Sequence, residues 1–344
     1  MSRGVGRVQM WMEMTAQAGK LFWQVAPGDG RIVVGLLPAG ESGLETMTYQ
    51  YPLKLISPAP SSSQPSTLVF LLSYGGGLVA GDGVNLTVHV KPEAKLSVAT
   101  QGHTKIFKSP TADVITTQNL DVTIDDHASM CLLPDPVQPF EDSVYAQKQI
   151  FKLRSKASLC LLDWVTQGRV ARGENWSFRK WTGRNEVWLE DEEATSAGRL
   201  LVRDSIILSR EASKSVGRTL PEMMQHMAIS GTLILRGSKT KSLGEFFQEE
   251  FAALPRIGAR DFRSPETMAQ GNADVSDIER WRLQRLKEEK EGGVLWSAAN
   301  VRGCVVVKFG AKTVEAGRDW IGSMIIREGS IASEFGDKAL MCLR

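Results

Sequence analysis

Short segments in which apolar and polar residues alternate recur through the first half of the chain. In residues 84–90 every second residue is apolar, a spacing typical of a β-strand with one buried face. Similar alternation returns in three further segments, at 96–100, 113–124 and 158–162. A continuous apolar run at 67–73 and two short strands in 21–37, joined by a turn at 27–30, extend the pattern. Because no helical period separates these segments, we predict a mainly β body, antiparallel or wrapped.

Helical patterns are confined to the C-terminal part of the chain. Ser242 and Glu245 have capping-box spacing, and the apolar residues that follow fall on one face until Pro255. A second box, Ser276 with Glu279, opens another helix. We therefore expect about two α-helices, both toward the C-terminal half.

The second of these helices lies in a stretch rich in Arg, Glu and Lys. Its many charges predict a solvated surface arm within an insertion around 260–291, with 260–271 as the most mobile part of the chain. The apolar segments that follow, at 305–307 and 321–326, are predicted to return to strand.

A glycine cluster follows the apolar run at 67–73. Gly75, Gly77 and Ala80 fit the dinucleotide fingerprint G-x-G-x-x-A, which leaves open a nucleotide-binding enzyme that uses Gly75–Gly83. A pyrophosphate, however, needs a helix directly behind the glycines, and here the chain leads into the alternating strand. We expect the glycines to allow backbone conformations and close chain approach instead.

Composition narrows the class of protein. The 41 basic and 39 acidic side chains leave a net charge of +2, so no strong field would attract nucleic acid or an anionic membrane. The chain shows no secretory signal, and its longest apolar stretch, 68–80, is too short to span a bilayer, so we expect a cytoplasmic protein.

Four separated cysteines predict buried reduced thiols. There is no G-x-S-x-G motif and no chelating pair of His or Cys, so we expect no enzyme.

Four motifs carry a resemblance to a known family. They are LSYGGGLVAGD at 72–82, QGHTKIF at 101–107, PDPVQPF at 134–140 and DWVTQGRVARGE at 163–174. In this order and spacing the sequence closely resembles the UreD (UreH) family of urease accessory proteins. The resemblance covers residues 19–344 as a single domain, and residues 1–18 match nothing and are expected to be a flexible N-terminus.

The resemblance implies a fold and a set of partners. It implies a β-helix-like stack of strands, and a non-enzymatic scaffold that joins UreF and the GTPase UreG, contacts apo-urease and helps deliver nickel. A higher-order dimer of the accessory complex is also expected. Nickel would pass transiently, with no tightly bound cofactor. A β-rich interaction protein unrelated to nickel remains the other alternative.

Transient passage of a divalent ion favours scattered carboxylates, because a tight His/Cys site releases its ion slowly. The candidates for the nickel path are Asp82, Glu141, Asp163 and Glu174, although each could equally cap a turn or form a surface ion pair. The residues expected to shape the body or the partner surface are Tyr74, Gly75, Gly76, Gly77, Gly81, Gln101, Gly102, Thr104, Lys105, Pro136, Pro139, Phe140, Gly168, Arg169 and Gly173.

Overall fold

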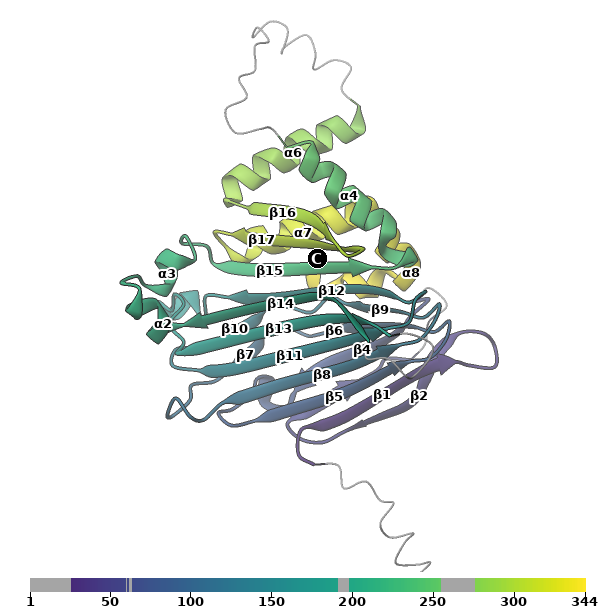
Figure 1. Ribbon diagram of the computed structural model, residues 1–344, viewed down its shortest axis with the longest axis horizontal. Coiled ribbons are helices and arrows are strands. Elements are labelled where there is room, and N and C mark those ends of the chain that lie inside the picture. The colour runs from purple at the N-terminus through teal and green to yellow at the C-terminus, as the bar shows by residue number, and fades with distance from the viewer. Residues whose placement is uncertain (1–25, 60, 62–63, 191–197, 255–275) are drawn as a thin grey trace, which may run out of the picture.

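Two β-sheets form the body of the protein in the computed structural model, which describes residues 26–59, 61, 64–190, 198–254 and 276–344 (Figure 1). The first sheet contains, in spatial order, β14 (Arg199–Ser209), β13 (Lys180–Leu189), β11 (Val144–Leu153), β8 (Thr116–Ile124), β5 (Gly83–Val90), β1 (Asp29–Leu36) and β2 (Ser42–Tyr49). The second contains β16 (Leu295–Val301), β17 (Cys304–Ala311), β15 (Ile229–Arg236), β12 (Ser158–Thr166), β9 (Ser129–Leu132), β6 (Lys95–Ala99), β4 (Thr67–Ser73) and β3 (Leu53–Ile56). Two short strands, β7 (Thr104–Ile106) and β10 (Val137–Pro139), join its side.

From β4 to β13 the chain alternates between the two sheets. The strands β5, β8, β11 and β13 pair in parallel in the first sheet, and β4, β6, β9 and β12 pair in parallel in the second. Antiparallel strands close both sheets at their ends: β2 and β14 in the first sheet, and β3 on one side and β15, β17 and β16 on the other side of the second. Both sheets are therefore mixed, and the mainly β prediction is confirmed.

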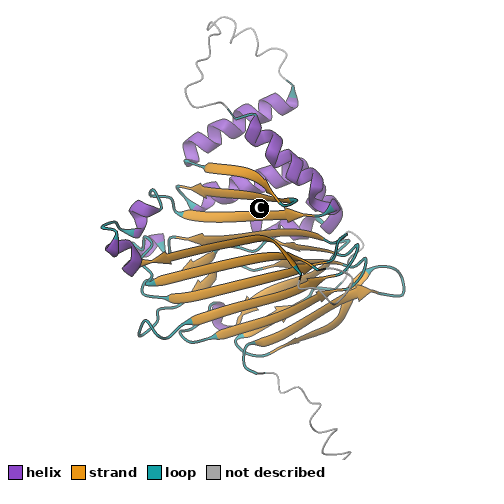
Figure 2. Ribbon diagram, in the orientation of Figure 1, coloured by secondary structure: helices purple, strands orange, loops and turns teal. Residues whose placement is uncertain are grey.

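Helices cover the outer face of the second sheet near β15, β17 and β16 (Figure 2). The α-helices are α2 (Arg210–Ser215), α3 (Leu220–Met223), α4 (Lys241–Ala252), α6 (Asp277–Gly292), α7 (Val314–Glu328) and α8 (Ser330–Phe335). The short 3-10 helices are η2 (Tyr74–Gly76), η3 (Val170–Arg172), η4 (Ser238–Thr240) and η6 (Asp337–Leu343). The expectation of about two helices is thus wrong, although every described α-helix does lie in the C-terminal half.

Two apolar cores result from this layering. One lies between the sheets and includes Leu86 and Phe151, and the other lies between the second sheet and α4, α7 and α8, where Phe247 and Trp320 pack. Strand β12 is buried along its whole length because it takes part in both cores. Each large side chain that becomes fully buried contributes about 1.5–3 kcal/mol, so these cores supply most of the stabilisation of the fold.

Three local predictions are wrong. Residues 321–326 lie in α7, because Thr313 caps a helix whose Trp320, Ile321, Met324 and Ile325 point to one core. The turn at 27–30 leads into β1, whose antiparallel partner is the later strand β2, and the rest of the proposed first strand lies outside the described residues. Helix α4 begins at Lys241 after η4, and Ser242 is not its cap.

The second capping box is confirmed, because Ser276 and Glu279 exchange side-chain and backbone hydrogen bonds at the start of α6. Helix α6 is exposed along most of its length, as predicted, but it packs on the body and is not a free arm. Arg285 is 2% exposed and binds Glu250 on α4, so a buried ion pair ties α6 to the body. Residues 260–271, and Pro255, lie outside the described residues.

Candidate functional site

The four motif segments meet at one end of the body. Strand β7 from the second motif pairs in parallel with β10 from the third, and β10 pairs with β12 from the fourth. Leu78 in the first motif forms a bridge to Ile106. Segments about 100 residues apart in the chain therefore form one continuous edge (Figure 1).

Several glycines let the loops at this edge adopt backbone conformations that other residues rarely adopt. The motif glycines with positive φ are Gly75, Gly76, Gly81, Gly102, Gly168 and Gly173. Only Gly fits well at Gly168, because φ is +110° and an added Cβ would lie 2.9 Å from Glu174 Oε2 and 3.1 Å from Pro139 O. Behind Gly81 the chain enters β5, and no helix starts there. The glycine cluster therefore lacks the helix N-terminus that a bound pyrophosphate requires.

Arg169 and Glu174 form the centre of the fourth motif. Glu174 is 6% exposed, and its carboxylate accepts hydrogen bonds from the Arg169 backbone N–H at 2.8 Å and from Arg169 Nε at 2.9 Å. Burial raises the pKa of Glu174, but the bonds from Arg169 and the backbone N–H of Glu141 outweigh it, so the pKa is lowered. The guanidinium also stacks 3.8 Å above the ring of Phe140. These contacts fix the third motif against the fourth.

Asp163 lies inside the body, between the two sheets. Its Oδ1 accepts a hydrogen bond from Gln147 Nε2 at 2.8 Å, and its Oδ2 accepts one from Asn185 Nδ2 at 2.6 Å. The polar chain continues from Gln147 to Tyr145 and from Asn185 to Gln149. Burial raises the pKa of Asp163 above its usual value despite these bonds, because its direct partners are neutral amides.

Asp82 and Glu141, the other two candidates, are placed differently. Asp82 caps a turn, since its Oδ2 accepts a hydrogen bond from the Val79 N–H at 2.8 Å. The Glu141 side chain is exposed. Within the part of the chain that the structure describes, no three His, Cys, Asp or Glu side chains are grouped as metal ligands. The four candidates therefore form no such group, although Glu141 lies beside Glu174 through its backbone N–H.

The predicted surface residues divide into exposed and supporting groups. Tyr74 is 42% exposed, lies 5.8 Å from the ring of Tyr51 and receives Lys54 over its face. Gln101 and Lys105 are exposed, whereas Thr104 and Pro136 are partly or fully covered. Phe140 is only 6% exposed and packs edge-on against Phe107. Phe140 thus supports the surface and does not project from it.

Asp135 and Arg318 were missed by the sequence reasoning. Asp135, 7% exposed, accepts hydrogen bonds from Thr100 Oγ1 at 3.1 Å and from the Gly102 N–H at 2.9 Å. Arg318 on α7 binds its other oxygen at 2.9 Å and also donates to the backbone oxygen of Cys342 at 2.8 Å. One guanidinium thus joins the second and third motifs to the C-terminal segment. In the sequence, the only indication of this site was the tripeptide Pro134-Asp135-Pro136 in the third motif.

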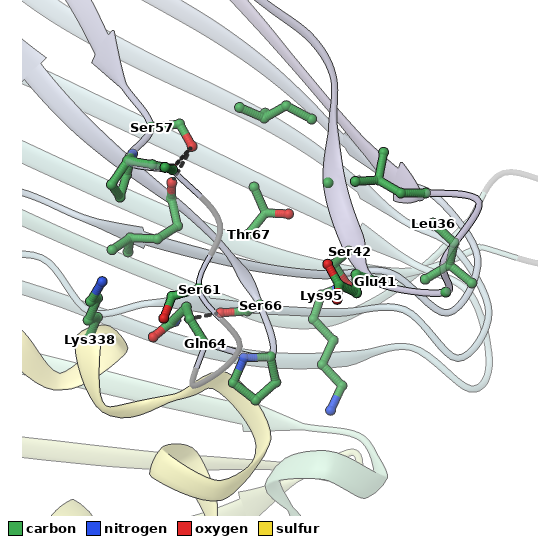
Figure 3. Close-up of a pocket in the computed structure, with 18 of the residues that line it drawn as sticks. Leu36, Glu41, Ser42, Ser57, Ser61, Gln64, Ser66, Thr67, Lys95 and Lys338 are labelled. Carbon is green, nitrogen blue, oxygen red and sulfur yellow. Dashed lines mark hydrogen bonds between the residues drawn. The ribbon is translucent and has the colours of Figure 1, made fainter.

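A cavity of about 650 Å³ lies away from the motifs, between the turn after β1 and the segment that precedes β4 (Figure 3). In the wall of this cavity, Ser57 Oγ donates a hydrogen bond to Leu68 O at 2.8 Å, and Gln64 Nε2 donates one to Ser66 Oγ at 3.1 Å. No residue predicted for the nickel path or the partner surface lines it.

All four cysteines are buried and free, as predicted. Burial raises the pKa of Cys304 and of Cys342 to about 11, so both thiols are protonated at neutral pH. Among the described helices, none has the length and apolar character needed to cross a membrane.

The fold and the site define a β-rich protein whose four motif segments build one shared edge. The sequence matches the family described as UreD urease accessory protein over residues 28–335. It is 33% identical over 276 residues to an uncharacterized urease accessory protein ureD-like from Schizosaccharomyces pombe, covering 80% of this chain and 86% of that one. It is also 32% identical to urease accessory protein D of Arabidopsis thaliana (64% and 71% covered) and 28% identical to urease accessory protein 4 of Cryptococcus neoformans (90% and 93% covered). The chain belongs to the UreD family of urease accessory proteins.

Proposed function

We propose that this chain is a non-enzymatic scaffold in urease maturation. It forms a complex with UreF, the GTPase UreG and apo-urease, and it assists delivery of nickel to the urease active site. The observation that carries this proposal is the convergence of the four family motifs on one edge, held by Arg169, Glu174 and Asp135. Rigid loops on a β scaffold suit a docking surface, because little side-chain and loop entropy is lost on binding.

In this proposal the motif edge is the partner surface. Its exposed residues Tyr74, Gln101 and Lys105 contact a partner, while Phe140 and the positive-φ glycines shape the loops beneath. The alternating parallel strands from β4 to β13 form the β-helix-like support, and the accessory complex forms a higher-order dimer.

Asp163 is the best interior candidate for the nickel path. A carboxylate held by neutral amides has no cation to displace, and an arriving Ni²⁺ would replace the missing positive charge. Glu174 already has a cationic partner in Arg169, so a passing ion would compete with an ion pair. Asp82 and Glu141, near the surface, would serve at an opening of the path. Weak, dispersed oxygen ligands favour passage over storage.

Reconstitution of urease tests this proposal. The chain should co-purify with UreF and UreG and support nickel-dependent activation of apo-urease. Asp163→Ala should lower activation strongly and Glu174→Ala should lower it less, while the matched control Asp121→Ala, an exposed partner of Lys152, should leave it unchanged. Full activation with both Asp163→Ala and Glu174→Ala would refute the path, and failure to co-purify would refute the scaffold role.

A further inference from the structure

A second, separate surface lies where the turn after α3 meets the start of β16 and the end of α6. Two adjoining hollows of about 440 and 390 Å³ share Gln225, Met227 and Leu295. We call this surface the methionine groove, and its residues are Met223, Met227, Leu286, Lys290, Leu295 and Lys312.

The methionine groove exposes large apolar side chains to solvent. Leu295, the first residue of an edge strand, is 59% exposed, and Met223 is 46% exposed. Methionine is flexible and polarizable, so it can adapt to an incoming apolar side chain. Contiguous exposed apolar residues with a polar rim mark interaction sites in soluble proteins.

The backbone beneath the groove is fixed. Gln225 and His226 both adopt positive φ, +52° and +58°, a conformation that costs free energy in residues other than glycine. Met227 packs on the backbone at Gly310, where an added Cβ would lie 2.4 Å from its Sδ. Its carbonyl oxygen accepts a hydrogen bond from Trp176 Nε1 at 2.8 Å. The turn is therefore held in place by β17 and by the loop that carries Trp176.

The charge of the groove is positive. Lys290 and Lys312 line it and form no ion pair with any described residue. Glu289, the one carboxylate in the wall, is occupied by hydrogen bonds from Arg285, Trp296 and Trp320. An apolar floor with unmatched ammonium groups on its rim complements a segment that has apolar residues on one side and carboxylates beside them.

We propose that the methionine groove binds an acidic amphipathic segment of a partner protein. The apolar side chains of that segment contact Met223, Met227 and Leu295, and its carboxylates bind Lys290 and Lys312. This inference rests on the proposed scaffold function, because it assumes that the chain docks partners, and it adds a second docking surface to the motif edge.

A direct binding assay tests the groove. The probe is a labelled 18-residue helical peptide with a Leu stripe flanked by Glu, and its counterpart carries Lys in place of every Glu. Fluorescence anisotropy with the full-length protein should show binding of the Glu peptide only. Leu295→Glu, and separately the pair Lys290→Glu and Lys312→Glu, should weaken binding at least tenfold, whereas Val301→Glu, exposed at the other end of the same strand, should not.

Three results would overturn the inference: no binding of the Glu peptide, equal binding of the Lys peptide, or affinity unaffected by Leu295→Glu. Groove-dependent binding to vesicles of phosphatidylserine and phosphatidylcholine, without peptide binding, would also overturn it. Urease activation measured in parallel separates the two proposals. Intact activation with failed peptide binding removes only the groove, and peptide binding with failed activation removes only the maturation role.

Discussion

Replacing Arg318 with methionine would remove a side chain that joins α7, the C-terminal segment and two motif loops. The substitution keeps most of the apolar stem but deletes the donors to Asp135 Oδ1 at 2.9 Å and to Cys342 O at 2.8 Å. It also removes the cation that lies 5.8 Å from the ring of Trp164. Asp135 would then be a buried carboxylate without a cationic partner.

The burial and remaining hydrogen bonds of the pair give the expected loss of stability for Arg318→Met. Breaking a fully buried ion pair costs about 3–5 kcal/mol because one charge is left unpaired. Here the Arg318 side chain is 23% exposed, and Asp135 keeps hydrogen bonds from Thr100 and Gly102. We therefore expect Arg318→Met to lower the free energy of unfolding by about 2–3 kcal/mol.

Urea unfolding of the purified chain measures this loss, and a double-mutant cycle with Asp135→Asn isolates the pair. The coupling free energy should be about 1–3 kcal/mol. Arg344→Met is the matched control: it removes an ion pair with Asp337 whose side chains are 51% and 73% exposed, and should cost at most about 1 kcal/mol. Equal losses for the two arginine variants, or coupling near zero, would refute the reasoning.

Two further predictions concern Asp163 and Gly168. Because burial raises the pKa of Asp163 above 3.8, its contribution to stability is present at low pH and lost as pH rises through the folded-state pKa. Asp163→Asn should therefore gain stability relative to the wild type between pH 4 and pH 7 in urea unfolding, and a constant difference would contradict this. Gly168→Ala places a Cβ beside Glu174 at positive φ and should cost about 1–3 kcal/mol, whereas Gly40→Ala, also at positive φ but in open space, should cost less. Similar losses for the two variants would show that the contact with Glu174 does not matter.

Strands with one buried face and the amphipathic helix α4 could be predicted from the sequence, whereas helix α7 could not. Residues 84–90 alternate because one side of β5 packs in the core, so local pattern and structure agree. Helix α7 presents apolar residues at 320, 321, 324 and 325. The segment 321–326 was predicted as strand because a short apolar segment fits both periods. The Thr313 cap and the packing of Trp320 against Phe309 and Phe247 together favour the helix.

In the candidate site, contacts between residues that are close in sequence could be anticipated, and contacts between distant residues could not. The four motifs could be recognised because each segment is contiguous, and Gly168 and Arg169 contact Glu174, a few positions away. Their role as a partner surface stays a prediction. Arg318 and Asp135 are far apart in the chain, and no spacing rule connects an arginine on a helix with an aspartate in a proline-rich loop. Such pairs depend on the register of whole sheets, which only the assembled fold provides.

Arg318 links motif loops in the first half of the sequence to the C-terminal segment. The family motifs end at residue 174, yet the loops at 100–102 and 134–135 are held by a helix that begins at Val314. Trp164, in the fourth motif, donates to Pro134 O at 2.8 Å from beneath the same arginine. Under the proposed function, a partner that docks on the motif edge would contact a surface whose shape depends on α7 and η6. If the proposal is right, substitutions in the C-terminal helices should impair docking without touching the partner, because Arg318 is the cation paired with Asp135 among the described residues.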